Sequence, residues 1–352
     1  MTRQLKFSDA ILEATRQCMA SDPRVYVIGL GVTDPKGIFG TTLGLEAEFG
    51  PRRVMDMPTS ENAMTGIAIG SALAGMRPVM THQRVDFALL ALDQIFNNAA
   101  KWHYMFGERL SVPLVIRLII GRGWGQGPQH SQSLQSVFGH FPGLRVVMPA
   151  TAYDAKGLLA AAIQDENPVI YLEHRWLHGV MGPVPETSYS VPIGHARVAR
   201  EGRDLTIVAS SYMTLEALRA AERLAKLNVD AEVIDLRSIR PLDEVTVLAS
   251  VRKTGRLIAA DLDWKAMGVS SEIVAIAAEQ ALGSLKCPPR RLAFADCPSP
   301  TSPALAKDFY PRAVHIVTAA KEMMGIKDSV DEFALLDPGL FDVPDPHFKG
   351  PF

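Results

Sequence analysis

The sequence predicts an α/β protein made of two doubly wound domains, and three observations predict it. Short apolar runs of strand length alternate with longer runs of helical spacing along nearly the whole chain. This alternation is typical of βαβ units in a parallel sheet. Apolar residues make up 47% of the 352 residues, which is enough for two hydrophobic cores. The alternation pauses once, at a proline-rich stretch near the middle of the chain.

The first domain is expected to span residues 1–180. Its candidate strands are continuous apolar runs, as found in parallel strands whose two faces are both covered. The segments between them place apolar residues three and four positions apart, which favours helices. The expected strands cover 25–30, 53–57, 77–81, 114–120, 145–148 and 169–172, and the expected helices cover 7–19, 61–74, 87–104 and 153–165.

Residues 181–192 are expected to form a linker, because glycine and proline interrupt the apolar periodicity there. A second, smaller α/β domain is expected over residues 193–326. The last segment, 327–352, is rich in Asp, Pro and Phe and is expected to be an extended tail, either a disordered end or a strap over a partner subunit. The second domain is expected to contain strands 205–209, 231–236, 256–260 and 291–295, and helices 214–227, 242–251 and 271–282.

Composition excludes several classes of function. The formal net charge is -2 and the basic residues are dispersed, which argues against nucleic acid as a partner. No apolar run is long enough to cross a membrane, and no signal peptide is apparent. Three cysteines, Cys18, Cys287 and Cys297, form no metal-binding or disulfide pattern. We therefore expect a cytoplasmic protein.

Four side chains suited to chemistry follow three separate strand-like runs. Glu61 begins a helix of small residues, Gln83 and Phe87 follow the next expected strand, and His130 lies in a loop after a glycine-rich stretch. That stretch, 121–127, lacks the spacing of a dinucleotide-binding motif and is expected to be a mobile loop over the active site.

Four sequence blocks carry a resemblance to a known family: 37–45, 91–101, 130–133 and 153–159. Together they resemble the β subunit of the thiamine diphosphate-dependent component of 2-oxo acid dehydrogenase complexes, of the pyruvate, acetoin or branched-chain type. This family belongs to the transketolase-like superfamily. The resemblance implies a pyrimidine-binding domain followed by a transketolase C-terminal-like domain, and a decarboxylase/dehydrogenase subunit.

The resemblance also implies roles for the four side chains. Glu61 would hydrogen-bond the pyrimidine ring of the cofactor and help its thiazolium carbon lose a proton. Phe87 would stack beside the pyrimidine, and Gln83 would be a nearby polar contact. His130 would lie near the reacting carbon, where it could transfer protons or stabilise developing charge. Without the resemblance, these residues read as a helix-start acid, a core aromatic, a strand-end amide and a loop histidine.

A Gly-Asp-Gly triplet, with which thiamine enzymes bind diphosphate and magnesium, is absent from the sequence. The resemblance therefore implies that a separate α subunit holds the diphosphate and Mg²⁺, in an α2β2 assembly. It also implies a lipoyl acyltransferase as a possible further partner. Backbone carbonyls of Ala162, Asp165 and Asn167 match the family's structural K⁺ site.

Three departures from the family pattern bear on the substrate. Leu30 replaces an acid, Arg84 stands where Phe is usual, and Arg175 follows Glu173 and His174. Arg84 and Arg175 would either meet an anionic acceptor or form surface ion pairs. Two alternatives to the dehydrogenase therefore stay open. One is a split transketolase-like enzyme that transfers a two-carbon or acyl unit to an aldehyde or sugar, and the other is a non-catalytic scaffold subunit.

Overall fold

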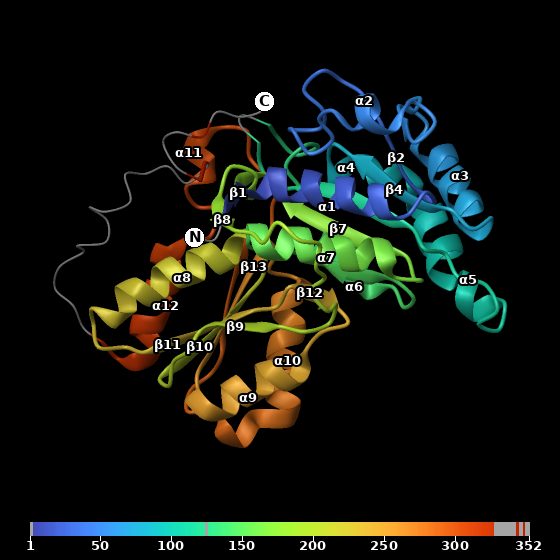
Figure 1. The fold of residues 1–352 in the computed structure, drawn as a ribbon. Coiled ribbons are helices and arrows are strands. Elements are labelled where there is room, and N and C mark those ends of the chain that lie inside the picture. Colours follow the sequence, from blue (N-terminus) through green and yellow to red (C-terminus); the bar gives the residue numbers. More distant parts are fainter. Residues whose placement is uncertain (1–2, 124–125, 327–342, 345–347, 349–352) are drawn as a thin grey trace.

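The computed structural model describes residues 3–123, 126–326, 343–344 and 348. Within them, the chain forms two α/β units, each built around its own sheet (Figure 1). The first sheet has seven strands in the order β12-β6-β7-β5-β4-β2-β3, and the second has five in the order β14-β13-β10-β11-β9. Both are parallel except at one edge strand each, so the predicted fold class is confirmed.

Alternate residues of the first sheet's strands face two different helical layers, as the continuous apolar runs predicted. One face packs against α1 and α7, which lie side by side, and the other packs against α3, the helical segment that follows β4, and α6. The strands are β2 (Val25–Gly29), β3 (Val54–Met55), β4 (Arg77–His82), β5 (Val115–Ile120), β6 (Arg145–Val147), β7 (Val169–His174) and β12 (Ser238–Arg240), and the helices are α1 (Phe7–Ser21), α2 (Leu45–Phe49), α3 (Glu61–Leu73), α6 (Gln135–His140), α7 (Ala152–Gln164) and the short η3 (Arg175–Leu177).

The second sheet is covered by α8 and α12 on one face and by α9 and α10 on the other (Figure 1). The apolar face of α8 also joins the core that lies under α1 and α7, so the two units share buried surface. The elements are β9 (Arg197–Arg200), β10 (Leu205–Ala209), β11 (Ala231–Asp235), β13 (Leu257–Trp264), β14 (Arg290–Phe294), α8 (Tyr212–Ala225), α9 (Glu244–Thr254), α10 (Val269–Ala281), η4 (Leu282–Ser284), α11 (Pro303–Ala306) and α12 (Ala313–Met324).

Several expectations need correction. The expected single helix at 87–104 is a succession of helical types, with a π-helix at its centre: α4 (Val85–Ala88), η1 (Leu89–Ala91), η2 (Asp93–Ala99) and α5 (Ala100–Met105). Part of the expected linker is β8 (Met181–Pro183), which pairs antiparallel with β1 (Gln4–Lys6). Each of these strands has only three residues and contains no apolar run, so local periodicity does not reveal it.

The most consequential correction concerns β12. This strand comes from the segment expected to belong to the second domain, yet it pairs antiparallel with β6 and extends the first sheet. The expected tail at 327–352 lies outside the described residues except for Val343, Pro344 and Phe348. Among these, the Val343 carbonyl accepts a hydrogen bond from Arg312 at 3.0 Å.

No helix in the described part of the chain has the length and apolar character needed to cross a membrane.

Candidate active site

The four predicted site residues follow strands of the first sheet at its carboxyl edge. Glu61 begins α3 after β3, Gln83 and Phe87 follow β4, and His130 follows β5. Because β2 pairs in parallel with both β3 and β4, and β4 with β5, these strands end at the same edge. Ligands of open α/β sheets bind at this edge.

The Glu61 side chain is buried at the first residue of α3, with 6% exposed surface. Its backbone carbonyl accepts a hydrogen bond from the Thr65 hydroxyl at 2.7 Å. Its carboxylate has no hydrogen-bond partner among the described residues. A carboxylate at a buried residue that the protein itself leaves without a hydrogen bond is a candidate for hydrogen bonding to a ligand.

Phe87 and His130 are brought together by the fold. Their ring centroids lie 5.4 Å apart at an interplanar angle of 83°, an edge-to-face contact. Phe87 is half-buried at the start of the helical segment after β4, whereas His130 is exposed. No described contact joins either residue to Glu61 or Gln83, so those residues share only the sheet edge with this pair.

The loop that carries His130 is held in place by Gln132, which sequence reasoning missed. The Gln132 side chain donates to the Asp86 carboxylate at 2.6 Å, and its carbonyl accepts from the Gly121 backbone N–H at 2.9 Å. Burial raises the pKa of the Asp86 carboxyl, and the hydrogen bond from Gln132 opposes that rise. The bond between Asp86 and Gln132 therefore ties α4, which bears Phe87, to the loop that bears His130.

Gln83 lies beside a cavity of about 440 Å³ that is lined by residues 34–40. Its side chain donates to the Leu30 carbonyl at 3.2 Å. Leu30, which replaces an acid of the family pattern, therefore contacts the candidate site through its backbone carbonyl.

Arg84 and Arg175 are not surface residues, and the expected alternative of surface ion pairs is wrong. Their exposed fractions are 3% and 7%, and both guanidinium groups lie over the Phe39 ring, at 5.6 Å and 4.5 Å from its centroid. Burial lowers the pKa of each to about 10, and for Arg84 the neighbouring charge of Arg175 contributes.

The glycine-rich loop is described only at its ends, because Trp124 and Gly125 lie outside the described residues. Gly121 has a φ of +77°, in the left-handed region that favours glycine. Its carbonyl accepts from Arg84 at 3.2 Å, and Gln126 accepts from the same guanidinium at 2.5 Å. Arg84 thus holds both ends of this loop.

The three residues that match the K⁺ site lie at and after the end of α7. The Asp165 carbonyl accepts a hydrogen bond from the Arg77 guanidinium at 3.1 Å, and the Asp165 carboxylate accepts from the Asn167 backbone N–H at 2.8 Å. No cluster of three or more His, Cys, Asp or Glu side chains suited to a metal occurs among the described residues. That finding does not bear on carbonyl ligands.

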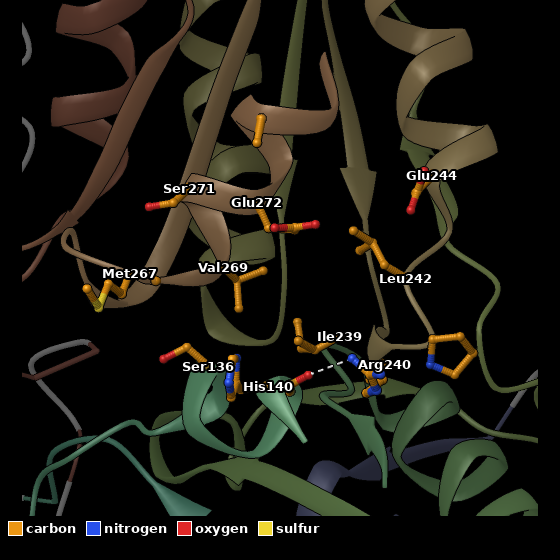
Figure 2. Close-up of a pocket in the computed structure, with 14 residues that line it drawn as sticks. Ser136, His140, Ile239, Arg240, Leu242, Glu244, Met267, Val269, Ser271 and Glu272 are labelled. Carbon is orange, nitrogen blue, oxygen red and sulfur yellow. Dashed lines mark hydrogen bonds between the residues drawn. The ribbon is translucent and has the colours of Figure 1, made fainter. Parts of the chain in front are cut away.

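A larger cavity, of about 630 Å³, lies away from the predicted residues, between α6 and the second unit. Figure 2 shows Ser136 and His140 on α6 facing Val269, Ser271 and Glu272 across this cavity. The Arg240 side chain reaches α6 and donates to the Gly139 carbonyl at 3.0 Å. The cavity marks the junction of the two units.

The residues at the sheet edge fit the pyrimidine half of thiamine diphosphate. The fit rests on the buried, unpartnered carboxylate of Glu61 and on the half-buried ring of Phe87, which offer a hydrogen-bonding group and an apolar surface. His130 supplies an imidazole in contact with that ring.

Two family models match most of the chain. Residues 3–179 match the family described as "Transketolase, pyrimidine binding domain", and residues 194–316 match "Transketolase, C-terminal domain". A solved structure described as a split-gene transketolase, inactive beta4 tetramer, is similar in fold, with a TM-score of 0.75 at 23% identity. The similarity covers 92% of this chain and 99% of the solved chain.

Curated relatives are similar over most of their length. The chain is 44% identical to the acetoin:2,6-dichlorophenolindophenol oxidoreductase subunit beta of Cupriavidus necator, covering 92% of this chain and 98% of that protein. It is 42% identical to the mitochondrial pyruvate dehydrogenase E1 component subunit beta-1 of Arabidopsis thaliana (91% and 89%). It is 40% identical to the 2-oxoisovalerate dehydrogenase subunit beta of Bacillus subtilis (91% and 98%). The chain therefore belongs to the transketolase-like, thiamine diphosphate-dependent family of 2-oxo acid dehydrogenase β subunits.

Proposed function

We propose that this chain binds the pyrimidine half of thiamine diphosphate and acts with an α subunit in the oxidative decarboxylation of a 2-oxo acid. One observation carries the proposal: a buried carboxylate without a described partner, Glu61, begins a helix at the sheet edge where Phe87 and His130 meet. When bound, thiamine diphosphate supplies a nucleophilic thiazolium carbon for attack on the 2-oxo group.

Each site residue has a defined task in this proposal. Glu61 hydrogen-bonds the pyrimidine ring, and its charge favours the proton distribution that activates the cofactor. Phe87 packs against the pyrimidine. Gln83, whose side chain is hydrogen-bonded to the Leu30 carbonyl, is a polar contact near the pyrimidine. His130 holds or transfers a proton near the reacting carbon, in the orientation that its contact with Phe87 favours.

A partner must supply the other half of the cofactor site. The family implies an α subunit, and we propose an α2β2 assembly in which that subunit holds the diphosphate and Mg²⁺. The absence of a Gly-Asp-Gly triplet from the whole sequence supports this division. We further propose a lipoyl acyltransferase as a partner that carries the lipoyl group to which the acyl unit is transferred. We also propose a cytoplasmic location, which three free cysteines support.

We also propose that backbone carbonyls of Ala162, Asp165 and Asn167 bind K⁺. The proposal rests on the match of these three positions to the family's site, and the Asp165 carbonyl also accepts a hydrogen bond from Arg77 at 3.1 Å. Thermal unfolding in K⁺ and in a matched concentration of N-methylglucamine tests this site. A bound ion raises the melting temperature in K⁺, and equal melting temperatures in both salts would reject it.

A split transketolase-like enzyme is the second candidate. The buried guanidinium groups of Arg84 and Arg175 favour it, because a cationic region close to Gln83 suits an anionic acceptor. NADH production that depends on lipoamide and a matched acyltransferase would support the dehydrogenase. Transfer to an aldehyde or sugar without lipoamide would support the second candidate.

Calorimetric titration tests the shared cofactor site. Thiamine diphosphate and Mg²⁺ are titrated into this chain alone and into this chain co-expressed with a candidate α subunit. We expect binding only in the mixture. Tight, magnesium-dependent binding to this chain alone would reject a site divided between two subunits.

A further inference from the structure

The loop that bears His130 continues directly into α6, and its far end is held by the second unit. The Gln135 side chain donates to Asp261 Oδ1 at 2.9 Å. The Ser136 backbone N–H and hydroxyl donate to Asp263 Oδ2 at 3.2 Å and 2.5 Å. The first two residues of α6 are therefore bonded to two neighbouring carboxylates of β13.

The two carboxylates are themselves held rigidly. Asp261 and Asp263 lie two positions apart on β13, both are buried, and both accept hydrogen bonds from the start of α6. Asp261 accepts from the backbone N–H groups of Leu262 at 2.9 Å and Ser270 at 3.0 Å. Asp263 accepts from the backbone N–H of Trp264 at 2.8 Å. Backbone donors on both sides leave little freedom for either side chain.

The electrostatic surroundings make this a costly way to hold a short helix. Burial raises the pKa of Asp263 to about 7, and the charge of Asp261 adds to the rise. Burial also raises the pKa of Asp261. The groups that face the pair are the side-chain donors of Gln135 and Ser136 and backbone N–H groups of α6, of β13 and of the start of α10, and the charge of Asp261 acts on Asp263. Apolar packing would anchor α6 at lower cost.

The bonds to β13 complete a set of restraints on the loop. Gln132 is tied to Asp86 in the first unit, as described above, and the Ser131 carbonyl accepts from the Ser299 hydroxyl of the second unit at 3.4 Å. His130 thus lies one residue before a segment, 131–136, that is bonded to both units. Displacement of α6 relative to β13 would move this segment and with it the imidazole.

We propose that Asp261 and Asp263 are positioning residues, which set the place of loop 130–136 and so hold the His130 imidazole against Phe87. The second unit would then take part in catalysis through this loop, besides any role in subunit contacts. The consequence for activity rests on the function proposed above, whereas the effect on the loop does not.

The test uses the complex with the α subunit and four variants of this chain. Asp263→Ala and Asp261→Ala remove the acceptors, and Asp263→Asn keeps an oxygen for Ser136. Asp243→Ala is the matched control, because Asp243 also accepts backbone and hydroxyl bonds in the second unit, from Thr246 at 3.0 Å and 2.8 Å, but does so at the start of α9. Hydrogen–deuterium exchange of residues 130–136 is measured by mass spectrometry, together with kcat and KM for pyruvate and 2-oxoisovalerate with 2,6-dichlorophenolindophenol as electron acceptor.

We expect the two Ala variants to speed exchange in 130–136 by about tenfold or more, and to lower kcat by about tenfold with KM changed less than about twofold, since a misplaced group costs rate more than binding. Asp263→Asn should restore both quantities, and Asp243→Ala should alter neither. Unchanged exchange in Asp263→Ala, failure of Asp263→Asn to restore it, or an equal effect of Asp243→Ala would overturn the proposal.

Two outcomes are separated from these. If the Ala variants do not assemble, Gln135→Ala and Ser136→Ala remove the donors from the other side of the same bonds, and faster exchange in 130–136 is again expected. If the wild-type complex oxidises neither acid, the proposed function fails for these substrates, and the exchange measurement still decides whether β13 positions the loop.

Discussion

The start of α3 and the end of β13 both bury carboxylates, but the surroundings of these carboxylates differ. Glu61 has no described hydrogen-bond partner, whereas Asp261 and Asp263 accept bonds from their own strand, from α6 and from the start of α10. A buried acceptor that the protein does not satisfy is available to a ligand, and one that is fully bonded serves to hold elements together. Burial alone therefore does not distinguish a binding residue from a positioning residue; the partners do.

Replacement of Glu61 should have the largest effect on activity. Glu61→Gln keeps the shape but removes the charge, so we expect kcat to fall by about 10³-fold, within the usual range for a lost acid–base group. The free energy of unfolding should change by less than about 0.5 kcal/mol, because no described bond of the side chain is lost. Steady-state kinetics of the assembled complex and urea unfolding measure the two quantities.

Glu244→Gln is the control for that change, because Glu244 also begins a helix, α9, but lies on the surface. It should leave kcat as in the wild type. If Glu61→Gln retained full activity in the complex, the chain would be a non-catalytic scaffold.

A smaller effect is expected at His130. His130→Ala removes an exposed imidazole whose described side-chain contact is the Phe87 ring. We expect kcat to fall by about 10²-fold, with the affinity for thiamine diphosphate nearly unchanged. Calorimetry with the assembled complex separates binding from rate. A loss of cofactor affinity equal to the loss of rate would assign His130 to binding instead.

The carboxylates of β13 should show their difference from Glu61 in the pH dependence of stability. Because the pKa of Asp263 is about 7 in the folded protein, above its ordinary value near 3.8, the folded state binds more protons between these pH values. The contribution of this group to stability therefore falls as pH rises through that window.

Asp263→Asn removes that titration. The free energy of unfolding of the variant, relative to the wild type, should increase as pH rises from about 4 to about 7, by no more than about 1.4 kcal/mol per pH unit. Urea unfolding at several pH values measures this difference. A difference that stays constant with pH would mean that Asp263 is not protonated more readily in the folded state.

Much of the fold and part of the site could be predicted from the sequence. The apolar runs placed β10 at its observed limits and located the other long strands to within a few residues, because each contains its own signal. The edge contributed by Glu61, Gln83, Phe87 and His130 followed from the order of strands in a parallel sheet. The burial of Arg84 and Arg175 did not follow, because a charged side chain in sequence carries no sign of the ring it will pack against.

The sequence by itself therefore determined the βαβ order, the two sheets and the edge at which the candidate residues gather, since local periodicity encodes each of these. Only the tertiary structure decided that β12 extends the first sheet and that β13 holds the start of α6. The contacts of β13 join residues that are far apart in the sequence. Gln135 and Asp261 are separated by 126 positions, and Ser136 and Asp263 by 127 positions. Polar pairs at such separations produce no periodic pattern in the sequence, and they form only when the two units pack against each other.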